Sequence, residues 1–261
     1  MLFIFLAVQA IGLYCGYQYL QLIKTGEAQP GFGNPENAYN SLFLFVYIIL
    51  TTLVIIAIIK YKKSLLKYFE MFAVFFASLF AFELLFMNDI IALPLAIALT
   101  VWKVRKPTIV SQDVALIFSV SGAGAILGGS LGVFPVLIFL FLLSVYDFVS
   151  VFITKHMVYM AKAITERPMA FTAAVPTRSK KWSHTFQLGG GDLVMPLILT
   201  IAVLNKLGPY HALFTFAGGF IALAGLMAYV LRKPGEPLPA LPPICAGACV
   251  GLFVAGMLFG V

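Results

Sequence analysis

Two aspartates lie in stretches of sequence that are otherwise largely apolar. Asp147 follows the run of residues 140–146, and Asp192 lies between three glycines and Leu193. A carboxylate at the centre of a bilayer costs about 2.5–3.5 kcal/mol on insertion scales. Such residues face the interior of a helix bundle, where they serve ion paths or reactive sites. Asp147 and Asp192 are therefore the first candidates for chemistry.

Two neighbouring carboxyl groups can divide the work of acid and base. Like charges close together do not both ionise cheaply, so the pair shares a proton. The ionised member can then take a proton from water while the protonated member polarises a scissile carbonyl. This chemistry predicts hydrolysis with no metal and no cofactor. Paired intramembrane acids also couple cations in transporters, so a cation transporter or leak channel is the alternative.

The composition predicts a polytopic membrane protein with a single domain over residues 1–261. Of these residues 62% are hydrophobic and 10% are charged, whereas about a quarter are charged in a soluble domain. The net charge of +7 is expected in cytoplasmic loops, which collect Lys and Arg, and does not indicate nucleic-acid binding. The first segment lacks a basic start and a small-residue cleavage site, which predicts a retained helix.

Apolar runs separated by polar residues predict an all-α protein with nine transmembrane helices. Several runs are shorter than the roughly 20 residues that cross a bilayer, and the fourth and seventh are the shortest. The expected spans cover residues 2–23, 41–59, 69–87, 90–102, 114–128, 133–154, 193–204, 210–231 and 243–261.

The basic residues predict which side each loop faces. With nine spans, one side holds only Lys24 and Lys206, and the other holds the remaining 15 of the 17 Lys and Arg residues. Because cytoplasmic loops are rich in Lys and Arg, we expect a cytoplasmic N-terminus and a C-terminus outside. Helices one to six then cover about residues 1–154, a cytoplasmic loop covers 155–188, and helices seven to nine cover about 189–261.

This topology brings the two acids to a similar depth on neighbouring helices. Asp147 lies seven residues before the cytoplasmic end of helix six, about 10 Å deep at the rise of an α-helix. Asp192 lies at the cytoplasmic mouth of helix seven. Pro196 removes the amide that would bond to the Asp192 carbonyl. Polar residues also form a stripe on helix six, at Ser144, Asp147, Ser150 and Thr154.

Three short motifs surround these residues. They are Tyr146-Asp147, Gly189-x-Gly191-Asp192 and, before the last helix, Pro239-Ala240-Leu241. In this order they resemble the motifs of presenilins and signal peptide peptidases. The resemblance implies an intramembrane aspartyl endopeptidase, with Asp147 and Asp192 as catalytic residues. It also implies that Tyr146, Gly189, Gly191, Pro239, Ala240 and Leu241 shape the active site and bind substrate.

The resemblance also bears on partners and location. Signal peptide peptidases have the inverted topology, so the predicted cytoplasmic N-terminus is similar to that of presenilins. The compact chain resembles a microbial, archaeal homologue. The implied substrates are single-span transmembrane helices cut within the lipid bilayer of a prokaryotic cell membrane. A homo-oligomer, accessory subunits and self-cleavage of the loop between helices six and seven stay open.

Other features have simpler interpretations. Cys15, Cys245 and Cys249 lie in apolar segments and are expected to be small buried hydrophobes. Pairs of glycines four residues apart predict close helix packing within the monomer. The apolar stretch 168–176 lies within a basic loop near Asp192, where it is either an interfacial anchor or a mobile lid over the active site.

Overall fold

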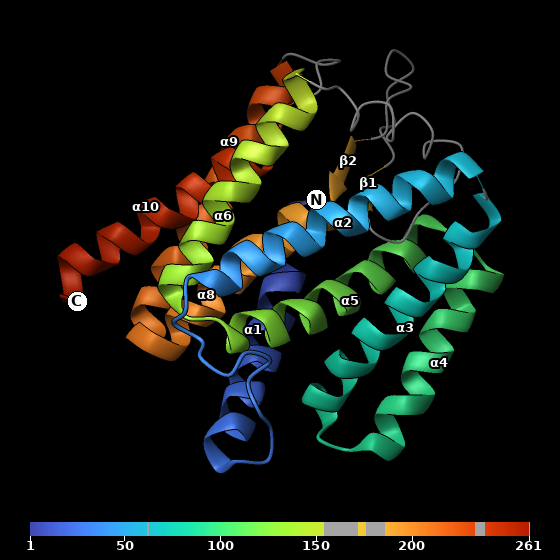
Figure 1. The fold of residues 1–261 in the computed structure, drawn as a ribbon, viewed down its shortest axis with the longest axis horizontal. Helices are drawn as coiled ribbons and strands as arrows, with labels where there is room; N and C mark the ends of the chain where they lie inside the picture. The colour runs from blue at the N-terminus through green and yellow to red at the C-terminus, as the bar shows by residue number, and fades with distance from the viewer. Residues whose placement is uncertain (62, 154–171, 176–185, 233–237, 261) are drawn as a thin grey trace.

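The computed structural model describes residues 1–61, 63–153, 172–175, 186–232 and 238–260 (Figure 1). In these ranges the chain forms nine α-helices, one short π-helix and two strands. The elements are α1 (Leu2–Thr25), α2 (Tyr39–Tyr61), α3 (Lys63–Phe86), α4 (Asp89–Arg105), α5 (Ile109–Ser130), α6 (Val133–Phe148), η1 (Val149–Ile153), β1 (Thr172–Val175), β2 (Phe186–Gly189), α8 (Gly190–Leu207), α9 (Pro209–Arg232) and α10 (Leu241–Phe259).

Eight of these helices are long and apolar enough to cross a membrane, so the expected count of nine such spans is wrong for the described chain. The exception is α4, whose 17 residues extend about 26 Å at the rise of an α-helix. Asp89 begins this helix and Lys103 and Arg105 occupy its last turn, so only a short apolar stretch remains between them. The protein is an integral, multi-pass, predominantly helical membrane protein.

The expected all-α fold is also interrupted by a β-hairpin. Strands β1 and β2 pair antiparallel, with Thr172 opposite Gly189 and Val175 opposite Phe186. The region was expected to be a cytoplasmic loop, but its backbone groups pair with one another and β1 contacts α5. Because β2 ends at Gly189, the hairpin leads directly into α8 and fixes where that helix begins.

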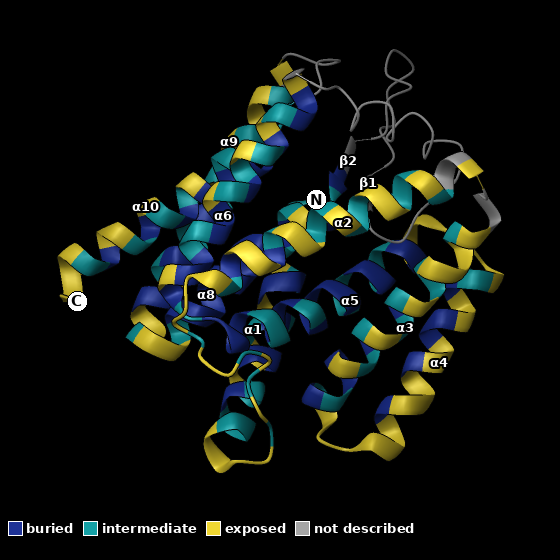
Figure 2. Ribbon diagram, in the orientation of Figure 1, coloured by how far each residue is buried: buried dark blue, intermediate teal, exposed yellow. Residues whose placement is uncertain are grey.

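Helix α8 lies at the centre of the bundle, where α1, α5, α6, α9 and α10 contact it (Figures 1 and 2). Glycines on α1 and α5 allow this close approach. A methyl group added at Gly12 or Gly124 would come within 2.3 or 2.5 Å of the Leu197 side chain of α8. Gly16 and Gly128 approach Ile201, one turn further along, in the same way. These glycine pairs pack within the monomer, as the sequence predicted.

Helices α9 and α10 contact each other backbone against backbone. A Cβ atom added at Gly218 would lie 2.2 Å from the carbonyl oxygen of Gly247. One added at Gly251 would lie 2.1 Å from the carbonyl oxygen of Phe214. Glycine at these positions is therefore required by the approach of the two helices.

Loops predicted to share one side of the membrane meet at one end of the bundle. Lys206, at the end of α8, forms a 2.6 Å ion pair with Glu36 in the α1–α2 loop. The Gly132 amide, between α5 and α6, donates to the Pro35 carbonyl at 2.8 Å. His211 near the start of α9 lies 3.1 Å from the Gly260 carbonyl oxygen. These contacts join the α1–α2 loop to the α5–α6 loop and to the end of α8, and they join the start of α9 to the end of α10.

Candidate active site

Asp147 lies at the last turn of α6 and is buried, with 7% of its surface exposed. Its Oδ2 accepts a hydrogen bond from the backbone N–H of Leu241 at 3.3 Å. Directly after Phe148 the α-helix gives way to the π-helix η1. Ser150 donates from its hydroxyl to the Asp147 carbonyl at 3.0 Å. π-Helical turns often occur at functional sites. Thr154, the last member of the predicted polar stripe, lies outside the described residues.

Asp192 lies in the first turn of α8 and is half-buried. Its Oδ2 accepts a hydrogen bond from the backbone N–H of Gly189 at 3.2 Å. The side chain thereby caps the start of its own helix, where free N–H groups favour an acidic side chain. Pro196 lies one turn later within α8 and is buried. It has no N–H to donate to the Asp192 carbonyl, so this carbonyl lacks its usual donor within the helix.

The structure brings Asp147 and Asp192 together. Helices α6 and α8 contact each other, and the two carboxyl groups interact electrostatically. Each carboxyl group also accepts a backbone N–H from a different segment, α10 for Asp147 and β2 for Asp192. The site therefore forms where four elements meet, and all four carry residues of the three motifs singled out in the sequence.

The other predicted site residues have more varied surroundings. The ring of Tyr146 packs edge to face on Phe45 of α2, with centroids 6.4 Å apart. Leu241 is buried, while Pro239 and Ala240 are half-buried at the entrance to α10. Gly191 is exposed, and a methyl group added to it would meet no atom within 4 Å.

Cys245 is a site residue that the sequence interpretation missed. It is buried within the apolar core, as expected, but it also interacts with both aspartates. The surroundings of its thiol also include the Ser144 side chain of α6. The available signal was its spacing, because Cys245 lies four residues after Leu241 and Ser144 lies three before Asp147. These spacings place both residues on the helix faces that carry the site.

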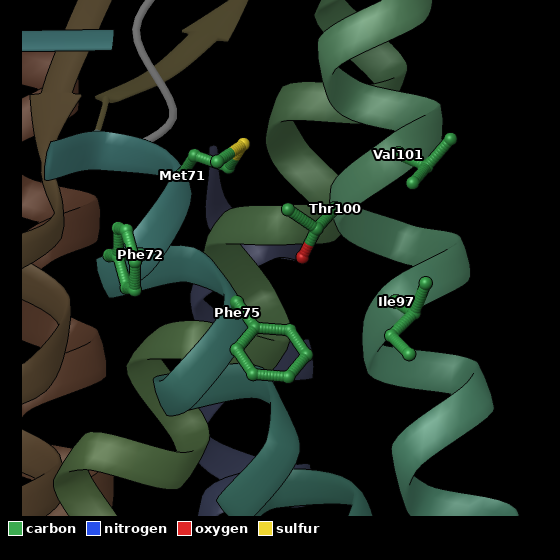
Figure 3. Close-up of a pocket in the computed structure, with 6 residues that line it drawn as sticks. All are labelled: Met71, Phe72, Phe75, Ile97, Thr100 and Val101. Atoms are coloured by element: carbon green, nitrogen blue, oxygen red, sulfur yellow. The ribbon is translucent and has the colours of Figure 1, made fainter. Parts of the chain in front are cut away.

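A groove elsewhere in the bundle does not contain these acids. It has a volume of about 160 Å³ and lies between α3 and α4 (Figure 3). The groove is lined by Met71, Phe72, Phe75, Ile97, Thr100 and Val101. The hydroxyl of Thr100 donates to Ala96 of its own helix at 2.8 Å. No acid or base lines this groove, so it is not a candidate active site.

Comparison with known proteins shows the family. The family model described as "Signal-peptide peptidase, presenilin aspartyl protease" matches residues 1–261. The chain belongs to this family. The protein is accordingly an intramembrane aspartyl protease and acts on transmembrane substrates in the bilayer.

Solved structures of presenilin family intramembrane aspartate proteases are similar to the whole chain. One, determined in space group C222, has 25% sequence identity and a TM-score of 0.70, covering 99% of this chain and 96% of that chain. Another, in space group P2, has 25% identity and a TM-score of 0.67, covering 96% of each chain. No curated protein sequence matches the chain. The fold and the protease assignment therefore agree with the resemblance found in the three motifs.

Proposed function

We propose that Asp147 and Asp192 are the catalytic pair of an aspartyl endopeptidase that cuts transmembrane helices. The observation that carries this proposal is the approach of the two carboxyl groups on α6 and α8. Each is held by one backbone N–H, at 3.3 Å for Asp147 and 3.2 Å for Asp192. These bonds orient one oxygen of each carboxyl group and leave the other oxygen available for water, substrate or a shared proton.

In this mechanism the pair holds one proton in the resting enzyme. The ionised carboxylate takes a proton from water as the water oxygen attacks the scissile carbonyl carbon. The protonated carboxyl group donates its proton to the carbonyl oxygen, so a tetrahedral diol forms. Its collapse breaks the C–N bond, one carboxyl group protonates the leaving amine, and a diol proton returns to the pair. Because the two acids titrate as a unit, neither is assigned to one role alone.

The substrate must unwind locally before this chemistry can begin. Within a bilayer the backbone N–H and C=O groups of a helix bond to one another, and this hides the scissile carbonyl. We propose that Tyr146, Gly189, Gly191 and the Pro239-Ala240-Leu241 segment shape the site that receives the unwound strand. The bond from Leu241 to Asp147 supports this role, because it joins the third motif directly to a reacting group.

The proposal extends to orientation and location. As a single domain over residues 1–261, the chain would have its N-terminus in the cytoplasm and its C-terminus outside, in the cell membrane of a prokaryote. The charge count assumes that the α1–α2, α5–α6 and α8–α9 loops face the same side of the membrane. Their contacts at one end of the bundle support this assumption. Cysteines introduced beside Lys106 should be labelled from the cytoplasm, and those beside Gly208 from outside. The reverse pattern would overturn this orientation.

The segment 168–176 stays a proposed lid. Only Thr172–Val175 is described, as strand β1, and its pairing with β2 places its backbone beside the segment that holds Asp192. Residues 168–171 and 176 lie outside the described residues. Replacing Met169, Phe171 and Val175 with serine should change the rate or position of cleavage while membrane insertion stays intact. Wild-type kinetics and fragments would make the segment an anchor only.

The decisive experiment uses purified protein and a single-span helix in detergent, with fragments identified by mass. Asp147→Asn and Asp192→Asn should each lower kcat by at least about a thousandfold, because an amide cannot act as base. Asp89→Asn is the matched control, since Asp89 is an exposed acid at the start of α4. Turnover near the wild-type level in either site variant would sink the assignment. Ion flux without cleavage would favour the transporter.

A further inference from the structure

Gln9 is a polar residue at the centre of the bundle that the proposed mechanism does not use. It lies on α1 and is almost fully buried, with 1% of its surface exposed. Its Nε2 donates a hydrogen bond to the carbonyl oxygen of Leu193 at 3.3 Å. Leu193 directly follows Asp192 in the first turn of α8. A side chain from the first helix therefore holds the turn of backbone that carries one proposed catalytic acid.

The other end of the Gln9 amide is an acceptor with no partner among the described residues. Its Oε1 is buried and no described donor reaches it. A buried acceptor left unsatisfied destabilises the folded protein. An apolar residue of similar size would avoid this cost. In the same turn, Pro196 leaves the Asp192 carbonyl without its helical donor. Gln9 Oε1 therefore needs a donor, the Asp192 carbonyl can accept one, and water is the small molecule that carries two O–H donors.

We propose that Gln9 is a positioning residue for the protease reaction. Its Nε2 fixes the first turn of α8 through Leu193, and its Oε1 binds a buried water beside Asp192. The two functions act together, because one planar amide fixes both the position of the first turn of α8 and the position of the water. Gln9 does not touch the reacting atoms. It acts through Asp192 and through the supply of ordered water to the site.

This inference rests on the proposed role of Asp192, and the two can be separated. If Asp192→Asn keeps wild-type turnover, the proposed function fails. If Asp192→Asn is inactive while variants of Gln9 are fully active, only the role of Gln9 fails. The variant to test is Gln9→Met, which keeps the length of the side chain and removes both polar atoms.

Gln112 provides a matched control. It lies on α5, is also 1% exposed, and its Nε2 has no partner among the described residues. The hydrogen bonds of the described residues include none from Gln112 to the first turn of α8. Gln112→Met therefore removes an equally buried amide with an equally unsatisfied atom. It does so without changing the support of Asp192.

The experiment measures kcat, KM and thermal unfolding for both methionine variants and for Gln9→Asn. Gln9→Met should lower kcat by about ten- to a hundredfold, the effect of misplacing a reacting group, and leave KM within about twofold. Its unfolding temperature should be unchanged or higher, since a costly buried acceptor is removed. Gln9→Asn keeps the amide on a shorter stem and should fall between Gln9→Met and the wild type. Gln112→Met should keep wild-type kcat.

Three outcomes would overturn the inference. The first is a kcat of Gln9→Met within about twofold of the wild type. The second is an equal loss of kcat in Gln112→Met, which would make the effect one of general packing. The third is a fall in kcat that merely follows a lower unfolding temperature, with no recovery in Gln9→Asn. Each of these results would assign Gln9 to the architecture of the bundle and not to the reaction.

Discussion

Helices α8 and α2 are both apolar, yet they occupy opposite environments. In the membrane-spanning window of α8, 61% of the residues are buried inside the protein, whereas only 11% are buried in α2 (Figure 2). The enclosed helix carries an aspartate and a proline, and the exposed helix has neither. In a bilayer, lipid is as apolar as a leucine side chain, so apolar character alone does not draw a helix inward. An acidic residue and close packing distinguish the central helix.

The glycine pairs on α1 and α5 explain how α8 comes to be enclosed. Leu197 and Ile201 of α8 fit against glycines from two helices, where larger residues would collide. Helix α2 has no glycine and contacts mainly α3 and α6. The difference between the two helices predicts where substitutions affect chemistry, where they affect stability and where they have little effect.

The largest effect is expected in the pH dependence of cleavage, because the two acids lie in the enclosed part of the bundle. At high pH both acids are ionised and no proton is available for the scissile carbonyl. At low pH both are protonated and no base is available for water. The rate should therefore fall about tenfold per pH unit on each side of an optimum. Cleavage measured across the range, with folding monitored in parallel, checks this. A single-sided profile in the folded enzyme would contradict a shared-proton pair.

Truncation of leucine should separate the two helices by stability. Leu197 on α8 is fully buried, and Leu53 on α2 is 57% exposed. Leu197→Ala should cost about 2–5 kcal/mol, because it leaves a cavity between three helices. Leu53→Ala should change stability by less than about 0.5 kcal/mol, since lipid or detergent replaces the lost contacts. Unfolding in detergent measures both values. Equal losses would mean that α2 is covered by protein, as in an oligomer.

Substitution of glycine by alanine tests close packing on a single helix. Gly218 and Gly225 both lie on α9, but an added methyl group meets the α10 backbone at Gly218 and no atom within 4 Å at Gly225. Gly218→Ala should cost about 1–3 kcal/mol through overpacking. Gly225→Ala should be neutral or stabilising by up to about 1 kcal/mol, because alanine favours a helix. If Gly218→Ala is as stable as Gly225→Ala, the two helices are not in backbone contact.

The smallest effect is expected at the exposed end of the bundle. Lys206 and Glu36 form an ion pair whose side chains are about half exposed. Lys206→Met should cost at most about 1 kcal/mol and should leave cleavage unchanged, since water screens this pair. The cost should decrease further in high salt. A loss of several kcal/mol, or a change in kcat, would show that this loop contact supports the site.

Much of the site could be predicted because its acidic residues lie in segments that are otherwise apolar. An aspartate in an apolar helix is costly, so Asp147 and Asp192 are conspicuous in the sequence. Cys245 was missed for the opposite reason, since a cysteine is ordinary in an apolar helix. Only the three-dimensional position, near both acids and near Ser144, reveals it. Gln9 needs the same information, because its partner is 184 residues away.

The helices were predicted from apolar runs, and their ends were less accurate. Helix α4 begins at Asp89 and ends at Arg105, so it extends beyond the apolar run into charged residues at both ends. Even so, it is not among the eight helices that are long and apolar enough to cross a membrane. The π-helix after Phe148 has no signal in hydropathy, since it changes the hydrogen-bond pattern and not the residue types. The β-hairpin was also missed, because strand pairing depends on the register of segments separated by a loop.

The contact of α9 with α10 through glycine has a mechanical consequence. At these glycines no side chain lies between the two backbones, so little room remains there for a shift of one helix against the other. They should move as one rigid unit. Leu241, at the start of α10, is the residue through which this helix pair is hydrogen-bonded to Asp147. Opening a path to the Asp147 carboxyl group from this side would therefore move both helices together.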